Sequence, residues 1–199
     1  IAGLQHICDV FDGKIIHLST DYVFDGKSGP YGEDDQTCPI SVYGKTKLAS
    51  ERILLDHNPD HLVIRGNVLY DYSTLSKASF LNWVVSSLIE DKEINVVKDQ
   101  INNPTWARSM ADVINLCISN DLNGIVHWGD ADHVNRFDFA KMIADRFSLD
   151  SRLIKPILTK ELGQTAPRPL QSGLMTTKIV KILDVIPPSI SDCLEEISI

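Results

Sequence analysis

Short apolar runs alternate with helical patterns along this chain of 199 residues. The continuous apolar pattern of buried strands occurs in KIIHLST (14–20), HLVIRGNVLY (61–70), EINVV (93–97) and GIVHW (124–128). Helical patterns lie between them, over 43–55, 80–89 and 108–119, and another helix begins after a capping Asn135. Strands that alternate with helices are typical of parallel sheets, so the sequence predicts an α/β protein.

The charge balance excludes several classes of partner. With 19 Lys and Arg against 27 Asp and Glu, the net charge is -8, and we expect neither a nucleic-acid surface nor a polybasic membrane patch. No apolar run approaches the roughly 20 residues of a membrane span. The four cysteines are far apart, with no Cys-x-x-Cys or Cys/His cluster, which predicts reduced thiols in a cytoplasmic protein and no metal site.

The first residues resemble the middle of a longer chain. Apolar side chains recur at helical spacing from Ile1 to Phe11, without an initial Met or a capping residue. We therefore expect the chain to be a fragment of something longer. We also expect an apolar face that the absent part would cover, either exposed or used for self-association as a homo-oligomer.

A glycine pattern at Gly26, Gly29 and Gly32 has the spacing of a dinucleotide-binding turn. That motif works by leading directly into a helix N-terminus, which holds the pyrophosphate. Here Pro30 and the acidic sequence EDDQ follow, and their carboxylates would repel a diphosphate. We interpret the segment as a loop.

Tyr43 and Lys47 stand four residues apart in SVYGKTK, so on a helix they lie on one face. Lowering a tyrosine pKa from 10 to about 7 requires roughly 4 kcal/mol. An ammonium about 4 Å away supplies about that much at an effective dielectric near 20. The pair is therefore a candidate general acid for carbonyl reduction, although Y-x-x-x-K also arises by chance in many helices.

Polar side chains end two of the predicted strands. Ser19 and Thr20 end the first, followed by Asp21, and Arg65 and Asn67 stand at the exit of the second. In open α/β sheets ligands bind beyond the carboxyl ends of the strands, so we expect these groups to share a crevice with the tyrosine and the lysine.

These segments carry a resemblance. STDYVFDG, then YGKTK, then DQ…NPT and a late RP…TTK closely resemble the dTDP-4-dehydrorhamnose reductase family of the extended short-chain dehydrogenase/reductases. The resemblance covers essentially the whole chain and implies the C-terminal part of a Rossmann-like, doubly wound parallel sheet plus a smaller α/β region. Residues 1–75 would be the remainder of the NAD(P)-binding domain, and 76–199 mostly the substrate-binding region, with elements returning to the first sheet.

The resemblance implies reduction of the C4 keto group of a nucleotide-linked 4-keto-6-deoxy sugar by NADPH or NADH, as in dTDP-rhamnose biosynthesis. Thr20 would be the catalytic hydroxyl, Tyr43 the general acid, and Lys47 the residue that binds the nicotinamide ribose and tunes the tyrosine. The implied cofactor contacts are Ser19, Tyr43, Lys47 and Asn67. The implied substrate contacts are Asp21, Tyr22, Asn103, Thr105 and Arg168, with Arg168 facing the diphosphate.

The family's glycine-rich turn and first βα units are absent from the sequence, on the order of 90 residues. The residue that selects NAD or NADP is therefore absent as well, and we expect the isolated chain to be inactive. One alternative is a non-catalytic subunit resembling the regulatory subunit of methionine adenosyltransferase. Another is a related reductase or epimerase that acts on a different nucleotide sugar.

Overall fold

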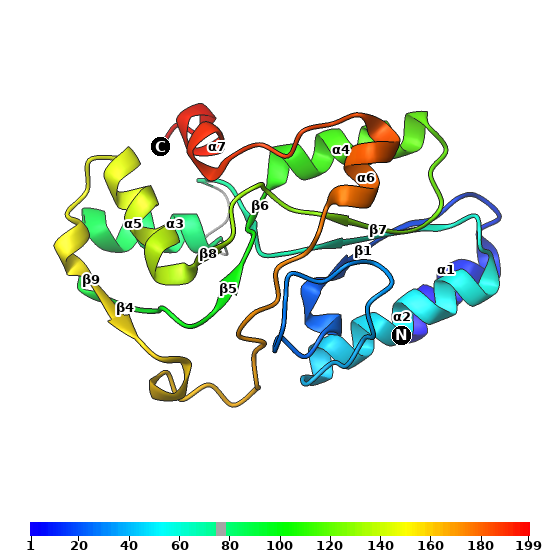
Figure 1. Ribbon diagram of the computed structural model, residues 1–199, viewed down its shortest axis with the longest axis horizontal. Helices are drawn as coiled ribbons and strands as arrows, with labels where there is room; N and C mark the ends of the chain where they lie inside the picture. Colours follow the sequence, from blue (N-terminus) through cyan, green and yellow to red (C-terminus); the bar gives the residue numbers. More distant parts are fainter. Residues whose placement is uncertain (75–78) are drawn as a thin grey trace.

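The computed structural model describes residues 1–74 and 79–199 as an α/β protein (Figure 1). Its elements are, in chain order, α1 (Ala2–Val10), β1 (Ile16–Thr20), α2 (Val42–His57), β2 (Leu62–Gly66), β3 (Leu69–Tyr70), α3 (Phe80–Ile89), β4 (Ile94–Val97), β5 (Ile101–Asn102), β6 (Thr105–Trp106), α4 (Ala107–Ser119), β7 (Gly124–Trp128), β8 (Val134–Asn135), α5 (Arg136–Arg146), β9 (Ile154–Ile157), α6 (Thr177–Leu183) and α7 (Ile190–Glu196). The predicted α/β class is confirmed.

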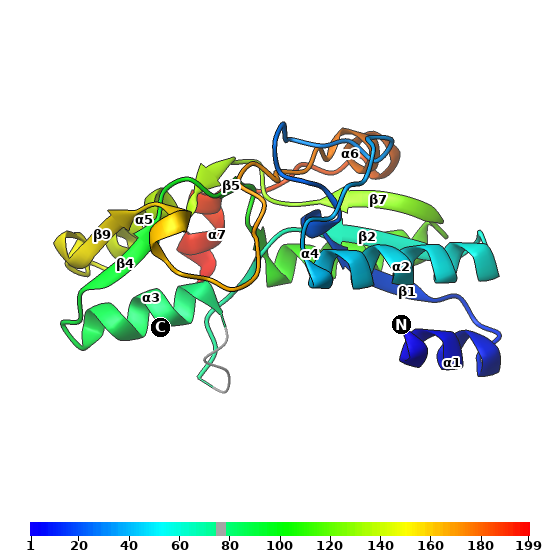
Figure 2. The same cartoon turned by 90° about the horizontal axis from the view of Figure 1, so that it is seen from below.

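A parallel sheet in the order β1-β2-β7 forms one half of the molecule. Leu62 of β2 lies opposite Ile16 of β1 and Gly124 of β7. Successive residues of β2 point to opposite faces, so Leu62 and Ile64 join a core with α4 and α6, whereas Val63 joins one with α1 and α2. Both faces of β2 are therefore buried between helices (Figures 1 and 2).

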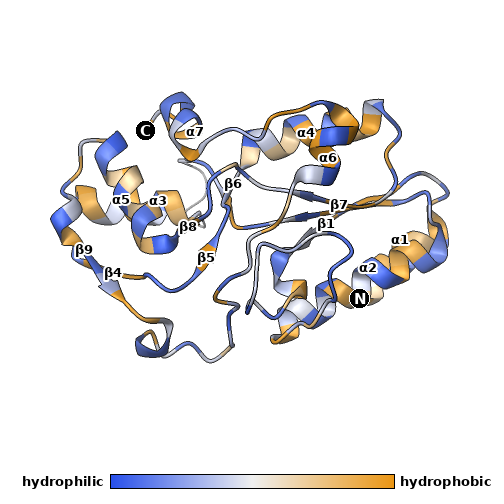
Figure 3. Cartoon of the chain, in the orientation of Figure 1, coloured by the Kyte–Doolittle hydropathy of each residue, from blue (hydrophilic) through white to orange (hydrophobic). Residues whose placement is uncertain are grey.

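The first predicted strand is less buried than its sequence indicates. β1 pairs with β2 along one side only among the described strands, and Leu18 keeps 39% of its surface exposed. Apolar side chains are also exposed on the neighbouring helix α1 and at its end, including Ile7, Val10 and Phe11. Figure 3 shows hydrophobic colouring along α1. The prediction of a buried strand is therefore wrong for β1. The exposed side chains agree with the expected apolar face, while self-association through it stays a prediction.

The run predicted as one strand over 61–70 is two strands that belong to different sheets. β2 ends at Gly66, where a Cβ atom would lie 2.8 Å from the Met110 methyl. After Asn67 and Val68 the chain forms β3, which pairs in parallel with β6. This departure from the sheet brings Asn67 to the edge where β1 also ends.

A second core lies in the other half of the molecule. Helices α3, α5 and α7 pack there with the parallel pair β4 and β9 (Figure 1). Although they come late in the sequence, α4, β7 and α6 belong to the first half. The predicted boundary at residue 75 lies outside the described residues, and the division of the chain at that point stays a prediction.

An extended segment, residues 170–175, joins the loop after β1 to β5. Gly29 N donates to Gln171 O (3.1 Å), Tyr31 N donates to Gly173 O (2.7 Å), and Ile101 N donates to Leu170 O (2.6 Å). Gly26 has a φ of +72°, and a Cβ atom there would lie 2.2 Å from Pro169 Cβ. The glycines thus permit close packing of a loop, in agreement with the interpretation of this segment from the sequence.

Candidate active site

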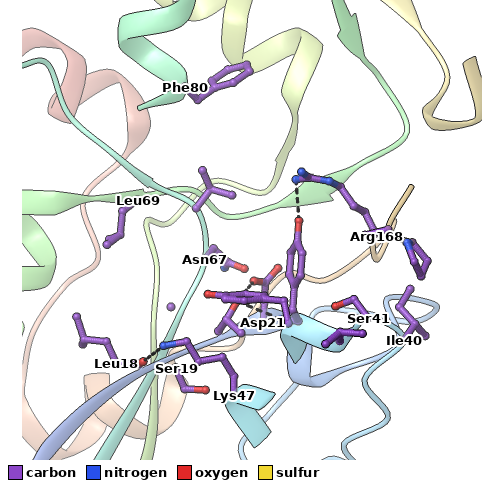
Figure 4. Close-up of a pocket in the computed structure, with 18 of the residues that line it drawn as sticks. Leu18, Ser19, Asp21, Ile40, Ser41, Lys47, Asn67, Leu69, Phe80 and Arg168 are labelled. Carbon is purple, nitrogen blue, oxygen red and sulfur yellow. Dashed lines mark hydrogen bonds between the residues drawn. The ribbon is translucent and has the colours of Figure 1, made fainter. Parts of the chain in front are cut away.

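A cleft of about 1210 Å³ lies at the carboxyl ends of β1 and β2. Most of the predicted site residues line it, namely Ser19, Thr20, Asp21, Tyr22, Tyr43, Lys47, Asn67 and Arg168. Figure 4 labels Ser19, Asp21, Lys47, Asn67 and Arg168 among the lining residues. They come from β1 and the turn after it, from α2, from the end of β2 and from the segment before residue 170. The geometry therefore brings together groups that are up to 149 residues apart in the sequence.

Helix α2 presents Tyr43 and Lys47 to the cleft from its first two turns. Ser41 caps the helix by accepting a hydrogen bond from Gly44 N (3.1 Å). The ring of Tyr43 packs edge-on against that of Tyr22, with centroids 5.6 Å apart, and 51% of Tyr43 is exposed. The phenol is thus fixed in orientation and open to a ligand.

Gly44 allows α2 to approach the turn that follows β1. A Cβ atom at Gly44 would lie 2.1 Å from the backbone oxygen of Tyr22. We expect Gly44→Ala to lower the free energy of unfolding by about 1–3 kcal/mol, because that backbone must move. Gly3→Ala in α1, where a Cβ meets nothing within 4 Å, is the matched control and is expected not to destabilise. Urea unfolding measures both, and equal stability of the two variants would contradict the close approach.

The predicted lowering of the Tyr43 pKa is not found. Burial raises the pKa of Tyr43 above its usual value of 10.0, and the charge of Asp21 acts in the same direction, whereas a hydrogen bond with Thr20 opposes them. The Lys47 ammonium donates instead to the backbone oxygen of Leu18 (3.0 Å). Tyr43 therefore remains a neutral proton donor at pH 7, and Lys47 is anchored to β1.

Thr20 and Asp21 form a buried network behind the tyrosine. Thr20 Oγ1 donates to Asp21 Oδ1 (2.9 Å), and Ser172 Oγ donates to Asp21 Oδ2. Asp21 is only 1% exposed, and burial raises its pKa to about 6 despite these two donors. Both Asp21 oxygens are engaged by the protein, so the carboxyl ties the 170–175 segment to β1.

The raised pKa of Asp21 predicts a stability that falls with increasing pH. Between pH 4 and 6 the folded state holds more protons than the unfolded state, so the free energy of unfolding decreases across this window by about 3 kcal/mol from Asp21. Burial also raises the pKa of Asp130 to about 6, so Asp130 lowers the free energy of unfolding further across the same pH window. In Asp21→Asn the decrease measured by urea unfolding at pH 4 and pH 7 is expected to be smaller by about 3 kcal/mol. The exposed Asp56→Asn should retain the full decrease, and a full decrease in Asp21→Asn would refute the assignment.

The side chains of Ser19 and Arg65 turn to the flank of the sheet. Ser19 Oγ donates to Glu51, which also receives Arg65 Nε (3.0 Å) and Arg65 Nη2 (2.8 Å). Arg65 Nη1 lies 3.3 Å from Nε2 of His127, whose pKa burial and then the Arg65 charge lower to about 3. The prediction that Arg65 faces the crevice is wrong, because its guanidinium neutralises a buried carboxylate. Ser19 lines the cleft, but its hydroxyl is engaged by Glu51.

Asn67, which lines the cleft, is linked through Asn103 to the 170–175 segment. Asn67 Nδ2 donates to Asn103 Oδ1 (2.5 Å), while Asn67 Oδ1 is buried with no partner among the described residues. Asn103 Nδ2 donates in turn to Leu174 O (3.2 Å). Asn103 and Thr105 are 1% and 0% exposed and lie outside the cleft lining, so the structure does not bring these two predicted substrate contacts to it.

Arg168 and Arg136 meet at the hydroxyl of Tyr22. Arg168 Nη1 donates to Tyr22 Oη (3.1 Å), and the Tyr22 side chain also lies close enough to Arg136 to raise the pKa of that guanidinium, against the larger lowering by burial. Arg136 lines the cleft but was not predicted from the sequence. Its only local signal is its place directly after the capping Asn135, which does not reveal where the side chain points.

The described residues contain neither a membrane-spanning helix nor a metal-binding cluster. None of their helices combines the length and apolar character needed to cross a bilayer. Within 1–74 and 79–199, no three His, Cys, Asp or Glu side chains are grouped so that they could hold a metal ion.

A family model and several known proteins match most of this chain. The family described as RmlD substrate binding domain matches residues 2–198. Methionine adenosyltransferase 2 subunit beta of Xenopus tropicalis is 34% identical over 177 residues, which cover 84% of this chain and 52% of that protein. dTDP-4-dehydrorhamnose reductase of Mycolicibacterium smegmatis is 31% identical over 179 residues, covering 88% and 54%. The chain thus spans about half the length of these relatives.

The fold is also that of solved structures. A dTDP-4-dehydrorhamnose reductase of Bacillus anthracis, in complex with NADP, superposes with a TM-score of 0.91 at 28% identity, covering 98% of this chain and 70% of that one. The corresponding protein of Clostridium acetobutylicum gives a TM-score of 0.88 at 27% identity, covering 98% and 69%. The predicted Rossmann-like fold class is confirmed by these neighbours.

Proposed function

We propose that this chain, which belongs to the RmlD substrate binding domain family, carries the proton donor and the sugar-side pocket of a nucleotide-sugar reductase. The reaction would reduce the C4 keto group of a nucleotide-linked 4-keto-6-deoxy sugar. The observation that carries this proposal is the convergence of Thr20, Tyr43 and Lys47 on one cleft at the carboxyl ends of the strands.

A reduced nicotinamide, NADPH or NADH, would supply the hydride. The cleft fits such a group, since the buried Asn67 Oδ1 has no partner among the described residues and could accept a hydrogen bond from a carboxamide. Leu18 and Met110 add apolar wall beside it. Lys47, bound to the Leu18 carbonyl, has two further ammonium protons for ribose hydroxyls.

Tyr43 would donate the proton that the C4 oxygen needs when the carbon gains hydride. Its raised pKa keeps the phenol protonated at neutral pH, and its exposed face opens into the cleft. Proton transfer to the developing alkoxide then removes charge as it forms. Thr20 would position the phenol, because its hydroxyl adjoins that of Tyr43 while its own proton is donated to Asp21 Oδ1.

The transfer of deuterium from the cofactor to C4 of the sugar tests the proposal. The protein is incubated with a dTDP-linked 4-keto-6-deoxy sugar and a nicotinamide cofactor deuterated on its reactive carbon, and the sugar is examined by mass spectrometry and NMR. One deuterium at C4 is the expected result. Deuterium absent from C4 in the protein that carries this sequence, with this sugar and with UDP-linked analogues, would contradict the proposal.

A non-catalytic binding subunit is the second candidate, favoured by the 34% identity to methionine adenosyltransferase 2 subunit beta. A binding subunit has no chemical need for a proton donor. Unchanged function after Tyr43→Phe, together with capture of a methionine adenosyltransferase catalytic subunit, would favour it over the reductase.

A further inference from the structure

Two cavities share a wall that contains two arginines. Beside the main cleft lies a smaller cavity of about 270 Å³, which Val96 of β4 helps to line. Phe80, Trp83, Arg136 and Arg168 line both cavities. A ligand that extends from Tyr43 into the smaller cavity must therefore pass the two guanidinium groups.

The hydroxyl of Tyr22 organises this junction. Arg168 Nη1 donates to it (3.1 Å), and Arg136, which lines the same wall, interacts electrostatically with Tyr22. A phenol oxygen that accepts bonds from arginines keeps its own proton available to donate. The junction therefore offers an anion two guanidinium groups and one hydroxyl donor.

The positive charge of the two arginines lacks a bound carboxylate. Among the residues that the structure describes, neither guanidinium lies within ion-pair distance of an acidic group. The Asp21 carboxyl acts on Arg136 electrostatically, but its oxygens are held by Thr20 and Ser172. Burial lowers the pKa of Arg136, and the nearby charge of Arg168 adds to that effect. Cationic groups held together in this way are stabilised by an anion placed between them.

Arg136 is also held rigidly. It is the first residue of α5, directly after the capping Asn135, and its backbone N donates to Gln100 O (3.3 Å). Its guanidinium carbon lies 5.3 Å from the centre of the Phe80 ring. Little side-chain freedom remains to be lost on binding, which favours recognition of a phosphate by the planar fork.

We propose that Arg136 binds the diphosphate of the nucleotide sugar together with Arg168 and the Tyr22 hydroxyl. The inference rests on the proposed function, which supplies a diphosphate-linked substrate, and it adds a residue that neither the sequence nor the family resemblance indicated. The sugar then faces Tyr43, and the nucleoside faces the smaller cavity. Guanidinium forks match the oxygens of two adjacent phosphates in number and geometry.

Calorimetric titration of dTDP and of inorganic pyrophosphate into the protein tests the assignment. Arg136→Met keeps a long apolar stem against Phe80 and removes the charge. We expect it to weaken binding of both anions by about tenfold to a hundredfold. Arg136→Lys should weaken the binding of both anions less, because lysine keeps the positive charge although it lacks the planar guanidinium group. Arg152→Met, on the surface and paired with Asp150, is the matched control and should bind as the unchanged protein does.

The outcomes separate this inference from the proposed function. If dTDP binds and Arg136→Met binds it equally well while Arg168→Met does not, the role of Arg136 is refuted and the reductase proposal stands. If Arg136→Met weakens the binding of dTDP but not the binding of pyrophosphate, Arg136 shapes the cavity for the nucleoside. That result also refutes a contact with the diphosphate. If the unchanged protein binds neither anion at millimolar concentration, the inference fails along with the nucleotide-sugar substrate.

Discussion

Tyr43→Phe in the protein that carries this sequence is expected to lower the rate of keto-sugar reduction by about 10²–10⁴-fold, while the affinity for NADPH stays unchanged. The variant removes one oxygen and keeps the ring that packs edge-on against Tyr22, so the cleft should retain its shape. The loss follows because the phenol is the neutral donor beside Thr20, which itself is oriented toward Asp21. Single-turnover rates, measured from the decrease in NADPH absorbance, give the effect free of product release.

The matched control is Tyr72→Phe, which removes the same oxygen from a tyrosine that does not line the cleft. It should reduce the sugar at the rate of the unchanged protein. A Tyr43→Phe variant that retains full turnover would exclude the tyrosine as proton donor. A variant that loses cofactor binding in parallel would instead indicate a role in shaping the cleft.

Glu51→Ala is expected to produce the largest loss of stability, about 3–5 kcal/mol in the free energy of unfolding. Glu51 and Arg65 are 2% and 3% exposed, and two hydrogen bonds join them. Removing the carboxylate leaves a guanidinium buried between β2 and α2 without a counter-charge. Urea unfolding at pH 7 measures the loss.

A second variant shows whether the loss arises from the uncompensated charge. In Glu51→Leu with Arg65→Met both charged groups are replaced by apolar side chains of similar length, and most of the stability should return. Failure of this double variant to recover stability would indicate that the ion pair itself holds α2 against the sheet. Ser19, which donates to Glu51, loses that hydrogen bond in both Glu51 variants.

Much of the fold could be predicted because it depends on local patterns. The helix over Phe80–Ile89 and the strand over Gly124–Trp128 have the predicted bounds, and Asn135 caps α5 as expected. The meeting of Tyr43 and Lys47 in one cleft also follows from a four-residue spacing on a helix, combined with the rule that parallel strands end at one edge.

The features that sequence reasoning missed depend on tertiary surroundings. An apolar run does not reveal how many neighbours a strand has, so the sequence could not show that Leu18 of β1 belongs to the expected exposed apolar face. Arg65 points to Glu51 because the helix that carries Glu51 packs on that flank of the sheet. The pKa of Tyr43 is raised chiefly by burial, and Lys47 donates to the Leu18 carbonyl instead of the phenol; neither burial nor side-chain direction follows from a four-residue spacing.

The most direct test of the account is a fluorescence titration of NADPH, with NADH alongside, into the protein that carries this sequence. The account predicts saturable binding that Lys47→Ala weakens and that the surface variant Lys141→Ala leaves unchanged. Such a result would place the nicotinamide beside Tyr43, where the proposed reaction requires it. Binding that is indifferent to Lys47, or the absence of binding up to millimolar cofactor, would contradict the claim that this cleft holds a nicotinamide.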